Sequence, residues 1–151
     1  MAQPAHEGIM SDSFVLNDKR AVVFGGGGSI GSAVARAFGA EGAEVFVAGR
    51  SKSKVDAVAR QINEGGGRAR PAVVDALDDT AVGKYLDLVV EQAGRIDVEF
   101  NAVLGSLADS AMLKESPHTE DTANAAVLLA SDRARMMTGT VHNATAGACP
   151  D

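Results

Sequence analysis

The chain has 151 residues, of which 46% are apolar and 23% charged, and its formal net charge is −6. These values are typical of one soluble globular domain, and an acidic balance with a pI near 5.0 argues against nucleic acid or an anionic membrane surface as the main partner. No apolar run approaches the roughly 20 residues of a membrane span. The single cysteine, Cys149, excludes an internal disulfide and fits a reducing compartment, so we expect a cytoplasmic protein.

The start of the chain differs from the rest. Residues 1–17 have neither the basic start nor the apolar stretch of a secretory signal. They predict a flexible N-terminal extension. Residues 18–151 are then expected to form a single domain of ordinary size.

Short apolar runs and helical periodicity alternate from residue 20 onward. The expected strands span residues 20–24, 43–48, 68–75, 96–101 and 138–143. The expected helices cover residues 30–38, 55–62, 82–93 and 119–130. Pro71 indicates that the third strand starts late or lies near a sheet edge. Residues 104–118 show no clear period, and Thr119 is a plausible N-cap for the helix that follows them.

This alternation predicts an α/β fold, in which a doubly wound parallel sheet carries helices on both faces, joined by right-handed crossovers. Sheets of this kind bind ligands beyond the carboxyl ends of their strands. That rule selects the loops that begin near Gly25, Gly49, Asp75 and Asn101.

The loop after the first strand carries the strongest signal. The segment Phe24–Gly31 reads FGGGGSIG, follows a strand and opens a helix. Glycines allow a tight turn and let backbone N–H groups approach a phosphate, while the helix points its positive end at the same place. We therefore predict a dinucleotide phosphate site, rather than a purely structural turn, at Gly25, Gly27, Gly28, Ser29, Ile30 and Gly31.

Basic residues follow the second strand, where NAD-binding units usually carry an acid for the ribose hydroxyls. Here the sequence is Arg50-Ser51-Lys52. A guanidinium can bind a 2′-phosphate through paired hydrogen bonds, whereas a carboxylate would repel it. The cofactor is therefore expected to be NADP, with NAD as the alternative, and with Arg50 as anchor and Ser51 or Lys52 assisting. A solvated basic helix start is the other interpretation.

The ends of the third and fourth strands carry further candidates for cofactor contacts, and each of them also has a purely structural interpretation. Asp75 could accept a hydrogen bond from an adenine amino group, or it could cap a helix or stabilise a turn. Asn101 and Ala102 follow the fourth strand, where the Asn amide could face a cofactor or fix the loop.

No catalytic or metal-binding constellation is evident. The three histidines lie far apart, and none has a metal-ligand neighbour at a useful spacing. Tyr85 is the only tyrosine, and Lys84 directly precedes it, so on a helix their side chains point in different directions. We expect Tyr85 to serve in packing or to lie on the surface.

These motifs together resemble the short-chain dehydrogenase/reductase family. The glycine loop is similar to its Thr-Gly-x-x-x-Gly-x-Gly motif, with Phe24 at the Thr and Ser29 at the middle Gly. Val74-Asp75 resembles the adenine-site Asp, and Asn101-Ala102-Val103 resembles the Asn-Ala-Gly turn without its Gly. The resemblance implies a Rossmann-like fold, NADP-dependent oxidoreduction of a carbonyl or alcohol, and cofactor contacts that include Ala76.

The resemblance also shows what is missing. Family members place a catalytic Ser and Tyr-x-x-x-Lys before the last helix, but no Tyr follows Tyr85 here, and Lys114 has no Tyr four residues before it. The chain resembles an internally truncated member with no catalytic residues of its own. We expect it to be inactive or very weak alone, with a catalytically inactive nucleotide-binding or oligomerisation module as the alternative function.

The missing segment also bears on topology and assembly. If the last strand pairs beside the fourth, the five strands take the order 3-2-1-4-5. Otherwise an unpaired edge could join another chain. Since one family interface uses the last helix and strand, we expect a homo-oligomer through residues 119–130 and 138–143.

Overall fold

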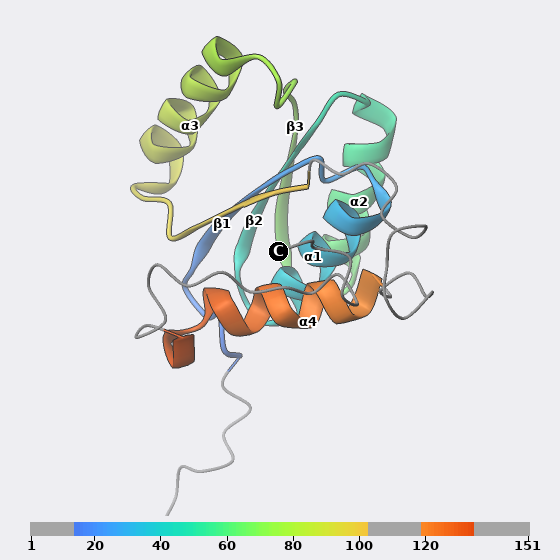
Figure 1. Ribbon diagram of the computed structural model, residues 1–151, viewed down its shortest axis with the longest axis vertical. Coiled ribbons are helices and arrows are strands. Elements are labelled where there is room, and N and C mark those ends of the chain that lie inside the picture. Colours follow the sequence, from blue (N-terminus) through green and yellow to red (C-terminus); the bar gives the residue numbers. More distant parts are fainter. Residues whose placement is uncertain (1–13, 103–118, 135–151) are drawn as a thin grey trace, which may run out of the picture.

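The computed structural model describes residues 14–102 and 119–134 as a parallel sheet flanked by helices (Figure 1). The strands are β1 (Arg20–Phe24), β2 (Glu44–Gly49), β3 (Arg68–Val73) and β4 (Val98–Asn101). Their order is β3-β2-β1-β4, and every neighbouring pair is parallel. This confirms the predicted order for the first four strands. The predicted strand at 138–143 lies outside the described residues.

The helices cover both faces of the sheet, as predicted. They are α1 (Ser29–Ala40), α2 (Lys52–Glu64), α3 (Asp79–Ala93), α4 (Thr119–Ala130) and the short 3₁₀ helix η2 (Asp132–Ala134). Buried side chains of α1, α2 and α4 share one apolar cluster with alternate residues of the central strands, including Val23 and Val45. The other residues of these strands, such as Val22 and Phe46, face α3. Because successive side chains of a strand point to opposite faces of the sheet, each central strand contributes to the apolar core on both faces.

Two strand boundaries differ from the sequence prediction. The third strand begins at Arg68 and ends at Val73, so Asp75 lies in the following turn and not in the strand. Pro71 lies opposite Val47 of β2 in the strand register. Its missing N–H is tolerated because, in the described sheet, β3 is an edge strand with no neighbour on its other side. The fourth strand begins at Val98, two residues later than expected.

The predicted extension 1–17 is too long at its C-terminal end. Leu16 is fully buried in the apolar cluster, and its N–H donates to the carbonyl of Glu41 at 3.0 Å. The turn around Asn17 therefore belongs to the folded domain. The sequence signal was weak because the apolar run Phe14-Val15-Leu16 is only three residues long and has no periodic pattern. Residues 1–13 lie outside the described part.

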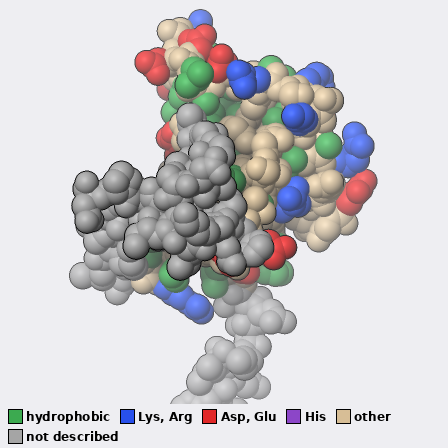
Figure 2. Space-filling model, turned by 45° about the vertical axis from the view of Figure 1, so that its right-hand side comes forward, with side chains coloured by type: hydrophobic (Ala, Val, Ile, Leu, Met, Phe, Trp, Pro, Cys, Tyr) green, Lys and Arg blue, Asp and Glu red, His purple; other side chains and the backbone are tan. Residues whose placement is uncertain are grey.

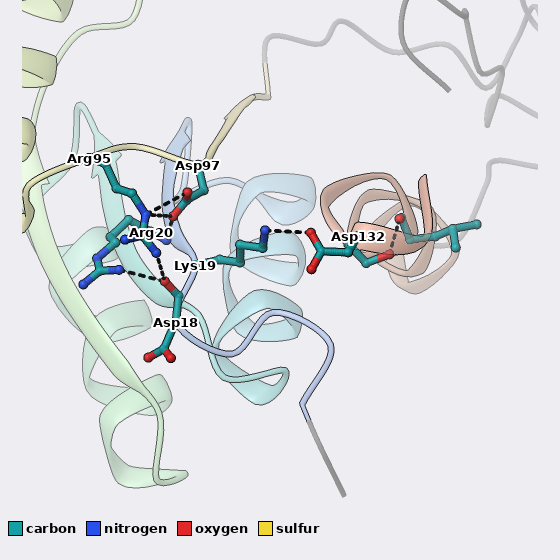
Figure 3. A network of polar contacts seen from close by, with 8 residues as sticks. Asp18, Lys19, Arg20, Arg95, Asp97 and Asp132 are labelled. Atoms are coloured by element: carbon teal, nitrogen blue, oxygen red, sulfur yellow. Dashed lines mark hydrogen bonds and ion pairs between the residues drawn. The ribbon is translucent and has the colours of Figure 1, made fainter. Parts of the chain in front are cut away.

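A polar network ties the amino ends of β1 and β4 together (Figure 3). The carboxylate of Asp97 accepts from the Arg20 backbone N–H at 2.8 Å and from Arg95 Nε at 3.0 Å. Burial opposes ionisation of Asp97, but these hydrogen bonds and the Arg95 charge hold the pKa of its carboxyl below the usual value. The guanidinium groups of Arg20 and Arg95 both donate to the carbonyl of Asp18.

Candidate nucleotide-binding site

The glycine loop between β1 and α1 is closely packed against its own backbone. Gly25 has φ +71°, and a Cβ there would lie 2.8 Å from the carbonyl oxygen of Ala102. A Cβ on Gly31 would lie only 2.0 Å from the carbonyl oxygen of Gly25. The Gly28 N–H donates to that same carbonyl at 3.0 Å, which closes the turn. The loop therefore requires glycine at 25 and 31 for its tight turn, and the predicted phosphate contact stays a prediction.

Helix α1 starts directly from this loop and has no side-chain cap. Gly28 is the N-cap residue, and the first turn of the helix contains no acidic residue. Ser29 is exposed at the start of the helix, while Ile30 packs against the core cluster. The N-terminal N–H groups of such a helix suit an anion. Ile30, in contrast, holds the helix to the core, so its predicted contact with a ligand is limited to its backbone.

A cleft of about 250 Å³ opens beside the loop at the carboxyl ends of the strands. Its lining residues come from the ends of all four described strands and the turns that follow them: Gly25, Gly49, Arg50, Val74, Asp75, Ala76, Leu77 and Ala102. The cleft thus lies where parallel sheets bind ligands.

Most of the lining follows the sequence prediction. Three lining residues were not predicted as site residues: Gly49, Val74 and Leu77. Each lies at or just after a strand end, and that position was the available signal. Eight predicted site residues are not among the lining residues: Gly27, Gly28, Ser29, Ile30, Gly31, Ser51, Lys52 and the last residue of β4, Asn101. Its neighbour Ala102 takes the place beside the loop.

Asp75 has the structural role that the sequence offered as the alternative. Its Oδ1 accepts a hydrogen bond from the Leu77 N–H at 3.0 Å, which stabilises the turn after β3. The side chain is nevertheless exposed and lines the cleft. Asp78, three residues on, caps α3 by accepting from the Ala81 N–H at 3.1 Å. The turn therefore holds Asp75 at the rim, where it remains open to a ligand.

The basic residues after β2 lie in different surroundings. Arg50 is exposed and lines the cleft. Ser51 is the N-cap residue of α2, and its hydroxyl lies 3.2 Å from that of Ser53. Lys52 forms an ion pair with Asp56 one turn along the helix. Of the residues predicted here, Arg50 alone reaches the cleft wall.

Tyr85 is a packing residue. It is buried against the sheet on α3, and its ring meets that of Phe24 edge to face, with centroids 6.2 Å apart. Burial raises the pKa of its hydroxyl to about 12. This confirms the expectation of packing and removes Tyr85 as an acid for chemistry in the cleft, because the ring is enclosed under β1.

The Tyr85 environment can be measured directly. Because this is the only tyrosine and the chain has no tryptophan, phenolate absorbance reports a single group. We expect it to ionise near pH 12 in the folded protein and near its ordinary pKa of 10.0 in urea. A pKa raised by folding means that stability is full below pH 10 and is lost as the pH rises toward 12. A titration near pH 10 with the fold intact would contradict this packing.

Two other site types have no counterpart in the described residues. Within residues 14–102 and 119–134, no group of three His, Cys, Asp or Glu side chains could hold a metal ion. In the same part of the chain, no helix has the length and apolar character needed to cross a membrane.

Comparison with known proteins gives the same family throughout. The family model for short chain dehydrogenase matches residues 19–135. An uncharacterized oxidoreductase of Mycobacterium tuberculosis is 34% identical over 142 residues, which are 94% of this chain and 50% of that protein. Meso-2,3-butanediol dehydrogenase of Serratia marcescens is 42% identical over 86 residues, which are 57% of this chain and 34% of that enzyme. The chain thus spans half the length or less of these relatives.

Solved structures agree with the sequence relatives. A metagenomic short-chain oxidoreductase in complex with NADP aligns with a TM-score of 0.58 at 27% identity, covering 89% of this chain and 69% of that one. A hydroxysteroid dehydrogenase from Escherichia coli aligns with a TM-score of 0.59 at 27% identity, covering 64% of this chain and 41% of that one. With its parallel sheet, its glycine loop and the family model across most of its length, the chain belongs to the short-chain dehydrogenase family.

Proposed function

We propose that this chain binds NADP through the adenosine half of the dinucleotide and does not transfer hydride efficiently by itself. The observation that carries the proposal is the cleft itself, in which a glycine cradle and an exposed arginine meet where NAD-binding units usually have an acid. A family relative of known structure is in complex with NADP, which supports the same ligand here.

The residues present fit this half of the cofactor. The Gly27 N–H and the first-turn N–H groups of α1, at Ser29 and Ile30, would hold the pyrophosphate. Arg50 would bind the 2′-phosphate, and Asp75 would accept a hydrogen bond from the adenine amino group. Ala102 would close the cleft over the loop. When bound, the cofactor would supply the redox chemistry, because NADPH donates a hydride to a carbonyl and NADP⁺ accepts one from an alcohol.

The acid–base half of the family chemistry is missing from the sequence. The only tyrosine is buried against Phe24, and no later residue provides Tyr-x-x-x-Lys. A well-placed proton donor typically contributes about 10²–10⁴ to the rate, so its loss leaves little turnover. The chain is therefore proposed as a nucleotide-binding member of the family.

Comparing the affinities of NADPH and of 2′-phospho-ADP-ribose, which lacks the nicotinamide ring, tests the proposal. We expect calorimetric dissociation constants within about threefold of each other, a difference below about 1 kcal/mol. We also expect no NADPH oxidation above background with a panel of carbonyl compounds. If NADPH bound much more tightly than 2′-phospho-ADP-ribose, or if turnover were clear, the protein would have to contact the nicotinamide half of the cofactor.

Self-association through the last helix remains part of the proposal. Leu128 and Leu129 on α4 are 50% and 42% exposed, which leaves apolar surface on this helix for a second chain to cover. The other predicted half of that interface, residues 138–143, lies outside the described part. Light scattering that shows a monomer at high concentration would count against it.

A further inference from the structure

Lys54 lies across the glycine loop, although sequence reasoning did not single it out. A Cβ on Gly27 would be 2.9 Å from Lys54 Cβ and 3.8 Å from its Cδ, so the stem of the lysine runs beside the loop backbone. A Cβ on Gly49 would be 3.5 Å from the Gly27 nitrogen, so the end of β2 meets the loop at the same point. Lys54 and Arg50 thus flank one short stretch of backbone.

The charges around this point are unbalanced. Three basic residues fall between 50 and 56, at positions 50, 52 and 54, against one acid, Asp56. Asp56 pairs with Lys52, and no ion pair is found for Lys54 among the described residues. The chain is acidic overall, yet basic side chains prevail over the side of the molecule that carries α2 (Figure 2).

A bound anion would offset a small unfavourable interaction at the start of α2. Lys52 and Lys54 lie in the first turn of α2, which has no acidic residue and no side-chain cap. Cations are unfavourable there because the helix end is itself positive. Asp56 pairs with Lys52, whereas the exposed Lys54 has no ion-pair partner among the described residues, so its ammonium group is available to a bound anion.

We propose that Lys54, and not Lys52, is the second cation that selects NADP over NAD, acting with Arg50 on the 2′-phosphate. This inference rests on the proposed function, since it names a specificity residue of that site. The contact with Gly27 sets the direction of the Lys54 stem along the loop. The flexible end of the side chain then carries its ammonium group to the phosphate on the adenosine side of the cleft.

Matched neutral substitutions of the two lysines test this inference in the full-length chain. Lys54→Gln and Lys52→Gln remove the same charge from the same helix turn, and both side chains are exposed, so both variants should fold. We expect Lys54→Gln to weaken the binding of NADPH about tenfold, while the affinity for NADH changes less than about twofold. Lys52→Gln should leave the ratio of the NADPH and NADH dissociation constants within about twofold of the wild-type ratio. Lys54→Arg should restore most of the preference.

The outcomes separate this inference from the proposed function. If the wild type binds NADPH in preference to NADH but Lys54→Gln keeps that preference, the Lys54 assignment is wrong and the proposed function stands. Equal losses for both nucleotides, or equal effects of the two glutamine variants, would likewise overturn the assignment. A wild type that binds neither nucleotide, or does not distinguish them, overturns both.

Discussion

Replacing Gly31 with alanine is expected to abolish NADPH binding and to lower the free energy of unfolding. The added Cβ would lie 2.0 Å from the carbonyl oxygen of Gly25 and 2.6 Å from its carbonyl carbon. Neither atom belongs to a flexible side chain, so the loop or the start of α1 must move. Forced overpacking of this kind costs about 1–3 kcal/mol, and the displaced loop would no longer present its N–H groups to a phosphate.

A second glycine in a helix provides the control. A Cβ added to Gly83 on α3 would meet no other atom within 4 Å. Gly83→Ala should therefore raise the free energy of unfolding by about 0.5–1 kcal/mol through helix propensity and leave NADPH binding unchanged. Urea unfolding and NADPH titration of both variants measure these effects. If Gly31→Ala bound NADPH like the wild type, the close loop geometry would be wrong.

The elements that the sequence predicts well are those with local signals. Buried strands such as β1 read as short apolar runs, and the spacing in α1 and α2 marks one buried face. The glycine loop is predictable because its requirement is also local: Gly25 and Gly31 are six residues apart and meet within one turn. The family resemblance adds the strand order, which periodicity alone does not determine.

The features that sequence reasoning missed depend on contacts between distant segments. Leu16 is buried because the turn before β1 packs beside Glu41 and Gly42, and the short apolar run at 14–16 does not indicate this distant partner. The contact between Lys54 and Gly27 joins the first turn of α2 to the glycine loop, which the register of β1 and β2 brings together. Asp75 illustrates a different limit, since one carboxylate both holds a turn and lines the cleft.

The position of α4 bears on the predicted fifth strand. Helix α4 packs on α1, on the face opposite α3, and its end is held near the start of β1 by the ion pair between Lys19 and Asp132 at 2.9 Å. A parallel strand added beside β4 after α4 would complete a left-handed crossover, because a right-handed one places its helix on the face of α3. Right-handed crossovers prevail in about 98% of cases. The predicted strand at 138–143 lies outside the described residues, so both the order 3-2-1-4-5 and the pairing of this edge with another chain stay predictions.

Arg50→Asp is expected to reverse the preference for NADP. Arg50 is the predicted anchor that lines the cleft, and a carboxylate there would repel the 2′-phosphate. Loss of paired, charge-assisted hydrogen bonds together with this repulsion should weaken NADPH about 100-fold, or about 2.7 kcal/mol. NADH should bind as well as to the wild type or better, since an acid at this strand end can accept hydrogen bonds from the ribose hydroxyls.

The matched control for this charge reversal is Arg60→Asp. Arg60 is exposed on the same helix-bearing side but lines a separate hollow between α2 and β3. Arg60 lies eight residues along α2 from Lys52, or roughly 12 Å of helix rise, which exceeds the roughly 8–10 Å Debye length at physiological salt. The affinities for both nucleotides should therefore change less than about threefold. Fluorescence titration with NADPH and NADH separates a local effect at position 50 from a general effect of net charge. Parallel losses for both nucleotides in both variants would mean that Arg50 does not touch the 2′-phosphate.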